Sequence, residues 1–261
     1  MPNLVLKTIS LNKRFGKNII ALNNVNIHLQ KGCILGLLGP NGSGKSTLIN
    51  ILANIVKKDS GEVYIFNKKI KDYSYQYKSS CGFVFEQPFY INKFTIQEYL
   101  RFSAVLYGLN DNIISKRIEE VLDFFELLEK QHEWIERCSK GIKKRVSIAT
   151  SLIHKPKLLV LDEPLTDLDV IMTKKLKDLF KKLRNKEISV LISSHNITDL
   201  EDICDDVHIF KNGNIIFKHS NHFNLVKNNL IESDKLSLKL NELFFDLFKE
   251  RLPHDNDRED L

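Results

Sequence analysis

Apolar residues follow two alternating patterns along the chain. Residues 32–39 (GCILGLLG), 157–164 (KLLVLDEP) and 188–195 (ISVLISSH) each hold a short continuous apolar run. Such runs are typical of strands buried on both faces of a parallel sheet. Between the last two runs, residues 169–186 space their apolar positions by three or four and predict a helix. This alternation predicts an α/β domain with a largely parallel sheet.

Antiparallel strands are predicted near the start of the chain and again near residue 212. Residues 4–11, 19–29 and 61–70 carry β-rich, partly alternating patterns. Residues 207–217 (VHIFKNGNIIF) are a hairpin candidate, because Asn212-Gly213 suits a tight primed turn between two strands.

The middle of the chain is predicted to be helical. Residues 96–109 and 115–130 place apolar side chains at three- and four-residue spacing. We therefore expect an inserted helical subdomain over about residues 88–155.

Charge, hydropathy and cysteine spacing limit the classes of protein to which this chain can belong. The 261-residue chain has a formal net charge of +6, but its lysines are spread along the whole sequence, so no nucleic-acid partner is expected. No apolar run approaches the roughly 18 residues that cross a bilayer, and the first residues do not resemble a secretory leader. We therefore expect a cytoplasmic protein. The cysteines are scattered without a CxxC pair and are expected to be reduced and mostly buried: Cys33, Cys81, Cys138 and Cys204.

A phosphate-binding loop is predicted at residues 39–46 (GPNGSGKS), between a strand and a helix. Glycines let backbone N–H groups converge on phosphate oxygens, and the following helix points its positive end at the same anion. Lys45 adds a full charge, and the Ser46 hydroxyl can bind Mg²⁺. The spacing and its context predict a nucleoside triphosphate site. The expected contacts are Gly39, Pro40, Asn41, Gly42, Ser43, Gly44, Lys45, Ser46 and Thr47.

Two acidic residues follow the apolar run at 158–161. The carboxyl edge of a parallel sheet is where α/β ligand sites form. We expect Asp162 to hold Mg²⁺ through water and Glu163 to orient or deprotonate the attacking water.

Several motifs in this order resemble those of an ABC-type ATPase subunit. They are the phosphate loop, "CSKGIKKRVSIATSLIHKPKLLVLDEP", "LTDLD" and "LISSH". The resemblance covers about residues 4–220. It implies a P-loop NTPase fold of ABC type, with a mixed or parallel central sheet, an antiparallel β subdomain and the inserted helical subdomain. It also implies ATP and Mg²⁺ as ligands.

The resemblance places the ATP-binding domain at residues 1–228 and leaves 229–261 as a C-terminal tail. We expect one amphipathic helix and a frayed, charged end in this tail. The helix would present Leu240, Leu243, Phe244, Leu247 and Phe248.

The resemblance also implies roles for residues outside the phosphate loop. Phe15 stands where the family stacks an aromatic ring on adenine. Ser139 and Gly141 belong to the motif that meets the γ-phosphate on a second subunit, although Ser139 is equally suited to cap a helix. His195 would hydrogen-bond the γ-phosphate. Asp169, with Asp167, belongs to the dimer-interface loop, and both are also candidate helix caps.

Three departures from the family pattern stand out. Lys140 replaces the first of two glycines after the serine, and Ile142 replaces a glutamine; we interpret this SKG variant as an exporter subtype. In "GFVFEQP" the register places Glu86 where the family has a metal-contacting glutamine, with Gln87 one residue later. Glu86 is favoured on spacing, and both residues offer an oxygen to Mg²⁺.

The predicted function is ATP hydrolysis that powers export. The partners would be an integral membrane permease subunit and a second ATP-binding subunit, identical or different, with the chain on the cytoplasmic face. The permease would dock near Phe89, Tyr90, Phe94 and Phe102, which are equally suited to pack the subdomain core. Three alternatives remain. The chain could be a soluble ABC-type ATPase that serves as an assembly factor, or one that works on nucleic acid or the ribosome. It could also be a catalytically silent subunit paired with an active one.

Overall fold

The computed structural model describes residues 3–71 and 76–220. Its central element is a parallel sheet with strand order β11-β10-β4-β9-β8-β7. The strands are β4 (Ile34–Leu38), β7 (Cys81–Val84), β8 (Leu158–Leu161), β9 (Ser189–Ser194), β10 (Asp206–Lys211) and β11 (Asn214–Ser220). β11 alone among them runs antiparallel, against β10. Every residue of β4, β8 and β9 is buried, as the continuous apolar runs predict.

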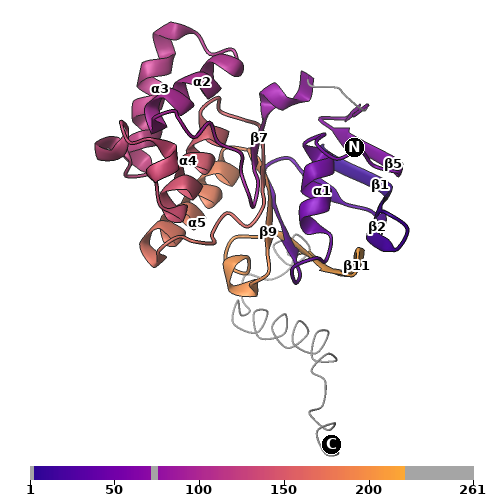
Figure 1. The fold of residues 1–261 in the computed structure, drawn as a ribbon. Coiled ribbons are helices and arrows are strands. Elements are labelled where there is room, and N and C mark those ends of the chain that lie inside the picture. The colour runs from indigo at the N-terminus through magenta and orange to yellow at the C-terminus, as the bar shows by residue number, and fades with distance from the viewer. Residues whose placement is uncertain (1–2, 72–75, 221–261) are drawn as a thin grey trace, which may run out of the picture. The chain divides into compact units, whose positions relative to one another are not determined.

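A second, antiparallel sheet forms from the first part of the chain and has the order β2-β1-β5-β6, with β3 also paired to β1. Its strands are β1 (Leu4–Phe15), β2 (Ile19–Val25), β3 (His28–Gln30), β5 (Ser60–Ile65) and β6 (Lys68–Lys69). Helix α1 (Lys45–Leu52) lies between the two sheets (Figure 1). One apolar core joins them, with members such as Leu6, Leu37 and Ile49.

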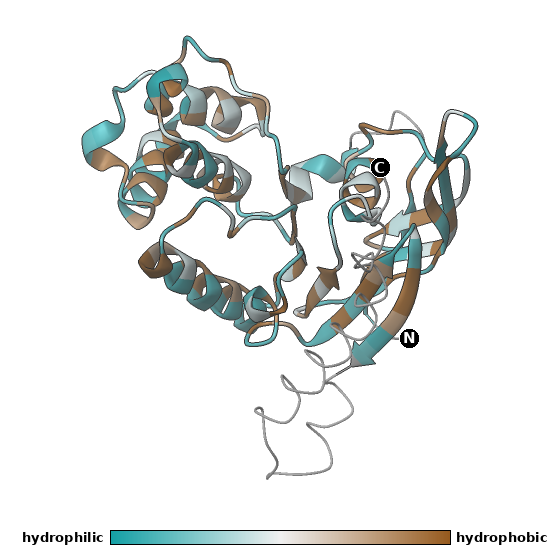
Figure 2. Ribbon diagram, turned by 60° about the horizontal axis from the view of Figure 1, so that its bottom comes forward, coloured by the Kyte–Doolittle hydropathy of each residue, from teal (hydrophilic) through white to brown (hydrophobic). Residues whose placement is uncertain are grey.

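The remaining helices lie on the other side of the parallel sheet (Figure 1). They are α2 (Ile96–Leu106), α3 (Asp111–Phe124), α4 (Lys140–Leu152) and α5 (Val170–Asn185). Hydrophobic and hydrophilic residues alternate along their ribbons (Figure 2), because each buries one stripe and exposes the other. Single 3₁₀ turns cover Gln76–Ser80, Leu128–Lys130, Ile135–Arg137 and Ile197–Asp199.

Side chains start three of these helices. Thr95 and Glu98 form a reciprocal capping box at α2, Ser139 accepts a hydrogen bond from the Ile142 N–H at α4, and Asp169 accepts one from the Met172 N–H at α5. The capping function expected for Ser139 and Asp169 is thus present in the fold.

The main sequence predictions about the fold are confirmed. The domain is α/β, with the expected parallel sheet, antiparallel sheet and central helices. The β10–β11 hairpin turns at Asn212 and Gly213, both with positive φ, as a primed turn requires. All four cysteines are buried.

Two further expectations concern the C-terminal tail and membrane-spanning segments. The tail at 229–261 and the boundary at 228 lie outside the described residues. Within residues 3–71 and 76–220, no helix combines the length and apolar character needed to span a bilayer.

Candidate active site

The register of the parallel sheet brings three loops to one edge. Leu38 of β4 pairs with Ser194 of β9, and Leu161 of β8 pairs with Ile192 of β9. The residues that follow these strands are therefore neighbours at the carboxyl edge. The phosphate loop is tied to β9 directly, because the Gly39 N–H donates to the Ser194 carbonyl at 3.2 Å.

Two glycines of the phosphate loop are required by close backbone approach. A Cβ on Gly39 would lie 2.5 Å from the Phe210 carbonyl oxygen, and one on Gly44 would lie 2.4 Å from the Ala21 carbonyl oxygen. Gly44 also has φ 113°, a conformation that L side chains rarely adopt. Beyond this crowded base, Asn41 and Gly42 are exposed at the tip, while Ser46 and Thr47 are half-buried in the first turn of α1.

Lys45 is the buried cation of the site. Its ammonium donates to the Gly39 carbonyl at 2.6 Å and to the Pro40 carbonyl at 3.2 Å. It also lies 3.6 Å from Oε1 of Glu163, and both side chains are 5% exposed. Burial lowers the pKa of Lys45, and the Glu163 and Asp162 carboxylates oppose that shift.

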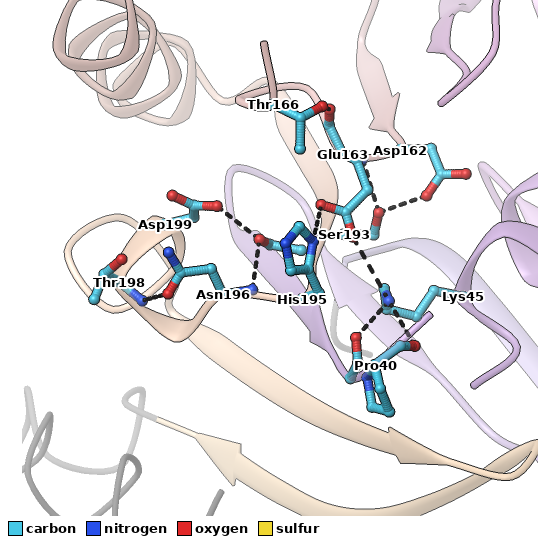
Figure 3. Close-up of polar contacts among 12 residues, drawn as sticks. Pro40, Lys45, Asp162, Glu163, Thr166, Ser193, His195, Asn196, Thr198 and Asp199 are labelled. Atoms are coloured by element: carbon cyan, nitrogen blue, oxygen red, sulfur yellow. Dashed lines mark hydrogen bonds and ion pairs between the residues drawn. The ribbon is translucent and has the colours of Figure 1, made fainter. Parts of the chain in front are cut away.

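Glu163 points toward both Lys45 and His195 (Figure 3). Its Oε2 lies 3.0 Å from Nδ1 of His195, whereas its Oε1 is buried without a hydrogen-bond partner in the described structure. His195 itself is half-exposed, so one side of its ring remains open to a ligand. Lys45, Glu163 and His195, three residues that the sequence analysis assigned to the nucleotide site, thus converge.

Ser193 is a site residue that the sequence analysis missed. Its hydroxyl donates to Oδ1 of Asp162 at 2.6 Å and accepts from the Glu163 N–H at 3.0 Å. One buried side chain therefore holds the carboxylate of the first acid and the backbone of the second (Figure 3). The available signal was the pair of serines, Ser193 and Ser194, at the carboxyl end of an apolar run.

The Glu163 backbone is held in an unusual conformation. Its φ is 47°, in the left-handed region, which costs about 1–3 kcal/mol for a residue with a side chain. Its carbonyl accepts hydrogen bonds from Thr166 Oγ1 at 2.8 Å and from Lys144 Nζ at 3.0 Å. These two hydrogen bonds hold the Glu163 peptide in this conformation.

The SKG motif, residues 139–141, lies at the start of α4. A Cβ on Gly141 would lie 2.8 Å from the Asp167 carbonyl oxygen, so this residue packs directly on the loop after Glu163. Asp167 has φ 63° and precedes the helix cap at Asp169. The Ser139 hydroxyl accepts a hydrogen bond from the Ile142 N–H at 3.3 Å, within its own helix.

The predicted adenine contact, Phe15, and the two candidates for the additional metal ligand, Glu86 and Gln87, are exposed. Phe15 ends β1 and is 41% exposed, with Lys13 Nζ 5.2 Å from its ring centroid. Glu86 and Gln87 are both exposed after β7 and line the same cavity of about 490 Å³, so their positions do not favour one over the other.

The predicted aromatic cluster has two half-buried members, Tyr90 and Phe94, and two exposed ones, Phe89 and Phe102. Tyr90 donates from its hydroxyl to the Lys143 carbonyl at 2.6 Å, and Phe94 packs edge-on against Phe102. Phe89 is 87% exposed. This segment therefore combines side chains that pack within the subdomain with an exposed apolar ring, that of Phe89.

Comparison with known proteins identifies the family. The ABC transporter family model matches residues 22–166, more than half of the chain. The linearmycin resistance ATP-binding protein LnrL of Bacillus subtilis is 33% identical over 81% of this chain and 68% of its own length. The sulfate/thiosulfate import ATP-binding protein CysA of Mesostigma viride is 34% identical over 79% of this chain and 59% of its own length.

Structural comparison agrees with the sequence match. A dimeric post-hydrolysis structure of the ATP-binding cassette MJ0796, bound to ADP and Pi, superposes with a TM-score of 0.77. It is 28% identical to this chain and covers 83% of it and 99% of the cassette. The family model, the relatives and the shared fold together show that this chain belongs to the ABC transporter ATP-binding proteins.

Proposed function

We propose that this chain binds and hydrolyses ATP to power export through a separate transmembrane permease. The observation that carries the proposal is the Glu163 carboxylate, which lies 3.6 Å from Lys45 Nζ and 3.0 Å from His195 Nδ1. A buried carboxylate aimed between a phosphate-loop lysine and a half-exposed histidine is suited to act on a water molecule beside a γ-phosphate.

ATP is the ligand that these residues fit best. The start of α1, together with the loop residues Asn41, Gly42 and Gly44, would offer backbone N–H donors to its phosphates, and Lys45 supplies the positive charge. The Ser43 hydroxyl is buried without a hydrogen-bond partner in the described structure, so it provides a further polar group in this loop. Phe15 would stack on the adenine ring.

Mg²⁺ fits the oxygen groups beside this loop. The Ser46 hydroxyl and the Asp162 carboxylate would hold it, with Glu86 or Gln87 as a further oxygen ligand. Ser193 occupies one Asp162 oxygen, which sets the orientation of the other. When bound, the ion would neutralise charge on the β- and γ-phosphates.

A second ATP-binding subunit, identical or different, would complete the site. Ser139 and Gly141 begin α4, where a helix N-terminus can bind an anion, and Asp167 and Asp169 lie in the adjoining loop. The related MJ0796 cassette is dimeric in its ADP-bound structure. We propose that the α4 start of one subunit contacts the γ-phosphate held by the other.

Transport requires a membrane partner, for which the family supplies the precedent. The exposed Phe89 and the half-buried rings near it would form part of the docking surface, on the cytoplasmic face of the membrane. Export is favoured by the SKG motif and by relatives such as the linearmycin resistance protein, whereas the sulfate/thiosulfate relative serves import.

Co-purification from detergent-solubilised membranes tests this function. A tagged chain should retain a multi-spanning membrane protein, and the captured complex should release phosphate from ATP. Capture of ribosomes or of soluble scaffold proteins instead would support the non-transport alternatives and contradict the proposal.

The direction of transport is tested in a strain that does not produce this protein. For export, loss of the chain should raise sensitivity to peptide antibiotics, and the Glu163→Gln variant should fail to restore resistance. Unchanged sensitivity combined with loss of nutrient uptake would contradict export.

A further inference from the structure

Lys144 is a buried lysine that the proposed ATPase chemistry does not use. It lies one turn into α4 and is 5% exposed. Its ammonium donates to the carbonyl oxygen of Glu163 at 3.0 Å. Taking an ammonium out of water is costly unless it is paired or hydrogen-bonded, so this contact is a built feature rather than a chance approach.

The Glu163 peptide is held from three directions. Lys144 and Thr166 Oγ1 donate to its carbonyl oxygen, and Ser193 accepts from its N–H. Ser193 belongs to β9 and Thr166 to the turn that follows Glu163, whereas Lys144 comes from α4. Lys144 is therefore the one of these three that connects the acid to a separate helix.

Helix α4 contacts the same turn a second time. Gly141 stands three residues before Lys144, on the same helix face, and its backbone packs against the Asp167 carbonyl. The side chains of Lys144, Thr166 and Asp167 also line one cavity. Residues 163–167 and the α4 start thus behave as one packed unit.

Charge complements this packing. The Lys144 ammonium is attracted electrostatically by four carboxylates, those of Asp167, Asp162, Glu86 and Glu163. Burial lowers the pKa of Lys144, and these acids oppose the shift.

From this geometry we propose that Lys144 is a positioning residue for hydrolysis, which orients the Glu163 carboxylate by holding its carbonyl oxygen. The inference rests on the proposed ATPase function. It also assigns the helix that carries Ser139 a direct mechanical connection to the hydrolytic acid. A displacement of α4 would then move the Glu163 peptide through the hydrogen bond from Lys144 to the Glu163 carbonyl.

The test replaces Lys144 with methionine, which keeps the length of the stem and removes the charged donor. We expect kcat for ATP to fall about 10- to 100-fold, the effect of a small misplacement of a reacting group, while KM and the ATP Kd change less than about threefold. Lys144→Arg keeps a charged donor and should restore most of the lost kcat.

Lys143→Met is the matched control. Lys143 is the adjacent residue on α4 and borders the same cavity, but its ammonium donates to the Glu136 carbonyl at 3.5 Å rather than to the Glu163 carbonyl. This variant should keep the wild-type kcat. A Lys144→Met protein with wild-type kcat would overturn the inference. So would one in which kcat falls and the ATP Kd rises together, with no rescue by arginine.

Two further measurements keep the result decisive. If Lys144→Met does not fold, Lys144→Gln, whose shorter side chain is uncharged, takes its place: a lower kcat at constant KM supports the inference, and a wild-type kcat overturns it. Glu163→Gln, run alongside, identifies failure of the proposed function itself, because full activity in that variant removes the acid from the chemistry.

Discussion

Nδ1 of His195 lies 3.0 Å from Oε2 of Glu163. Because the carboxylate only accepts, Nδ1 carries the proton in this contact, and the opposite ring nitrogen, Nε2, is left for a ligand. The contact joins the end of β9 to the end of β8, so the histidine and the acid form one unit.

Glu163→Gln should retain ATP binding and lose turnover. The amide cannot accept a proton from water, so phosphate release should fall about 10²- to 10⁴-fold, the usual contribution of a general base. Phosphate release is measured beside ATP affinity by calorimetry, and size-exclusion chromatography with ATP should show a trapped dimer. Undiminished phosphate release would remove Glu163 as the base.

His195→Ala should lower turnover about 10- to 100-fold, since it removes both the partner of Glu163 and the group proposed to contact the γ-phosphate. In the Glu163→Gln background the same change should add little, because residues that act as a unit are not additive. Equal losses in both backgrounds, in a double-mutant cycle of kcat values, would show that the two residues act independently.

Lys45→Ala should weaken ATP binding itself. The lost charge-assisted contact corresponds to about 1.5–3 kcal/mol, or roughly 10- to 150-fold in Kd. Calorimetry with ATP measures the change, and Lys116→Ala, which removes an exposed lysine from α3, is the control. Equal affinities in the two variants would contradict the assignment of Lys45.

Ser193→Ala should raise the Mg²⁺ concentration that gives half-maximal activity, because Asp162 loses the donor that orients it. The buried Glu163 N–H also loses its acceptor, so unfolding free energy should fall by about 1–3 kcal/mol. Ser194→Ala is the matched control, since Ser194 donates to Asp199 instead. Indistinguishable Mg²⁺ titrations for the two variants would count against the role of Ser193.

His208 should make the protein less stable in acid. Burial lowers its pKa from 6.5 to about 3, so below pH 6.5 the unfolded chain takes up a proton that the folded chain refuses until about pH 3. Stability is therefore lost as the pH falls through this window, by about 2 kcal/mol at pH 5. Urea unfolding at pH 7.5 and pH 5 should show this difference in the wild type and a smaller one in His208→Leu. An equal acid loss in the variant would exclude His208 as the cause.

Much of the fold was predictable because its signals are local. The apolar run at residues 34–38 requires burial on both faces, and the spacing from Gly39 to Ser46 requires a tight turn into a helix. Asn212-Gly213 specifies a turn with two positive φ values. Each signal lies within a few residues, and no distant partner changes it.

The sequence by itself determined the family, the order of the elements and the identities of Lys45, Glu163 and His195 as site candidates. Only the tertiary structure decided how they meet. Ser193 joins Asp162 to Glu163, and Lys144 reaches the Glu163 carbonyl, because sheet register and helix packing place residues 19 or more positions apart within 3.0 Å. Sequence spacing fixes local backbone geometry, whereas side-chain contacts between distant segments depend on how separate elements pack.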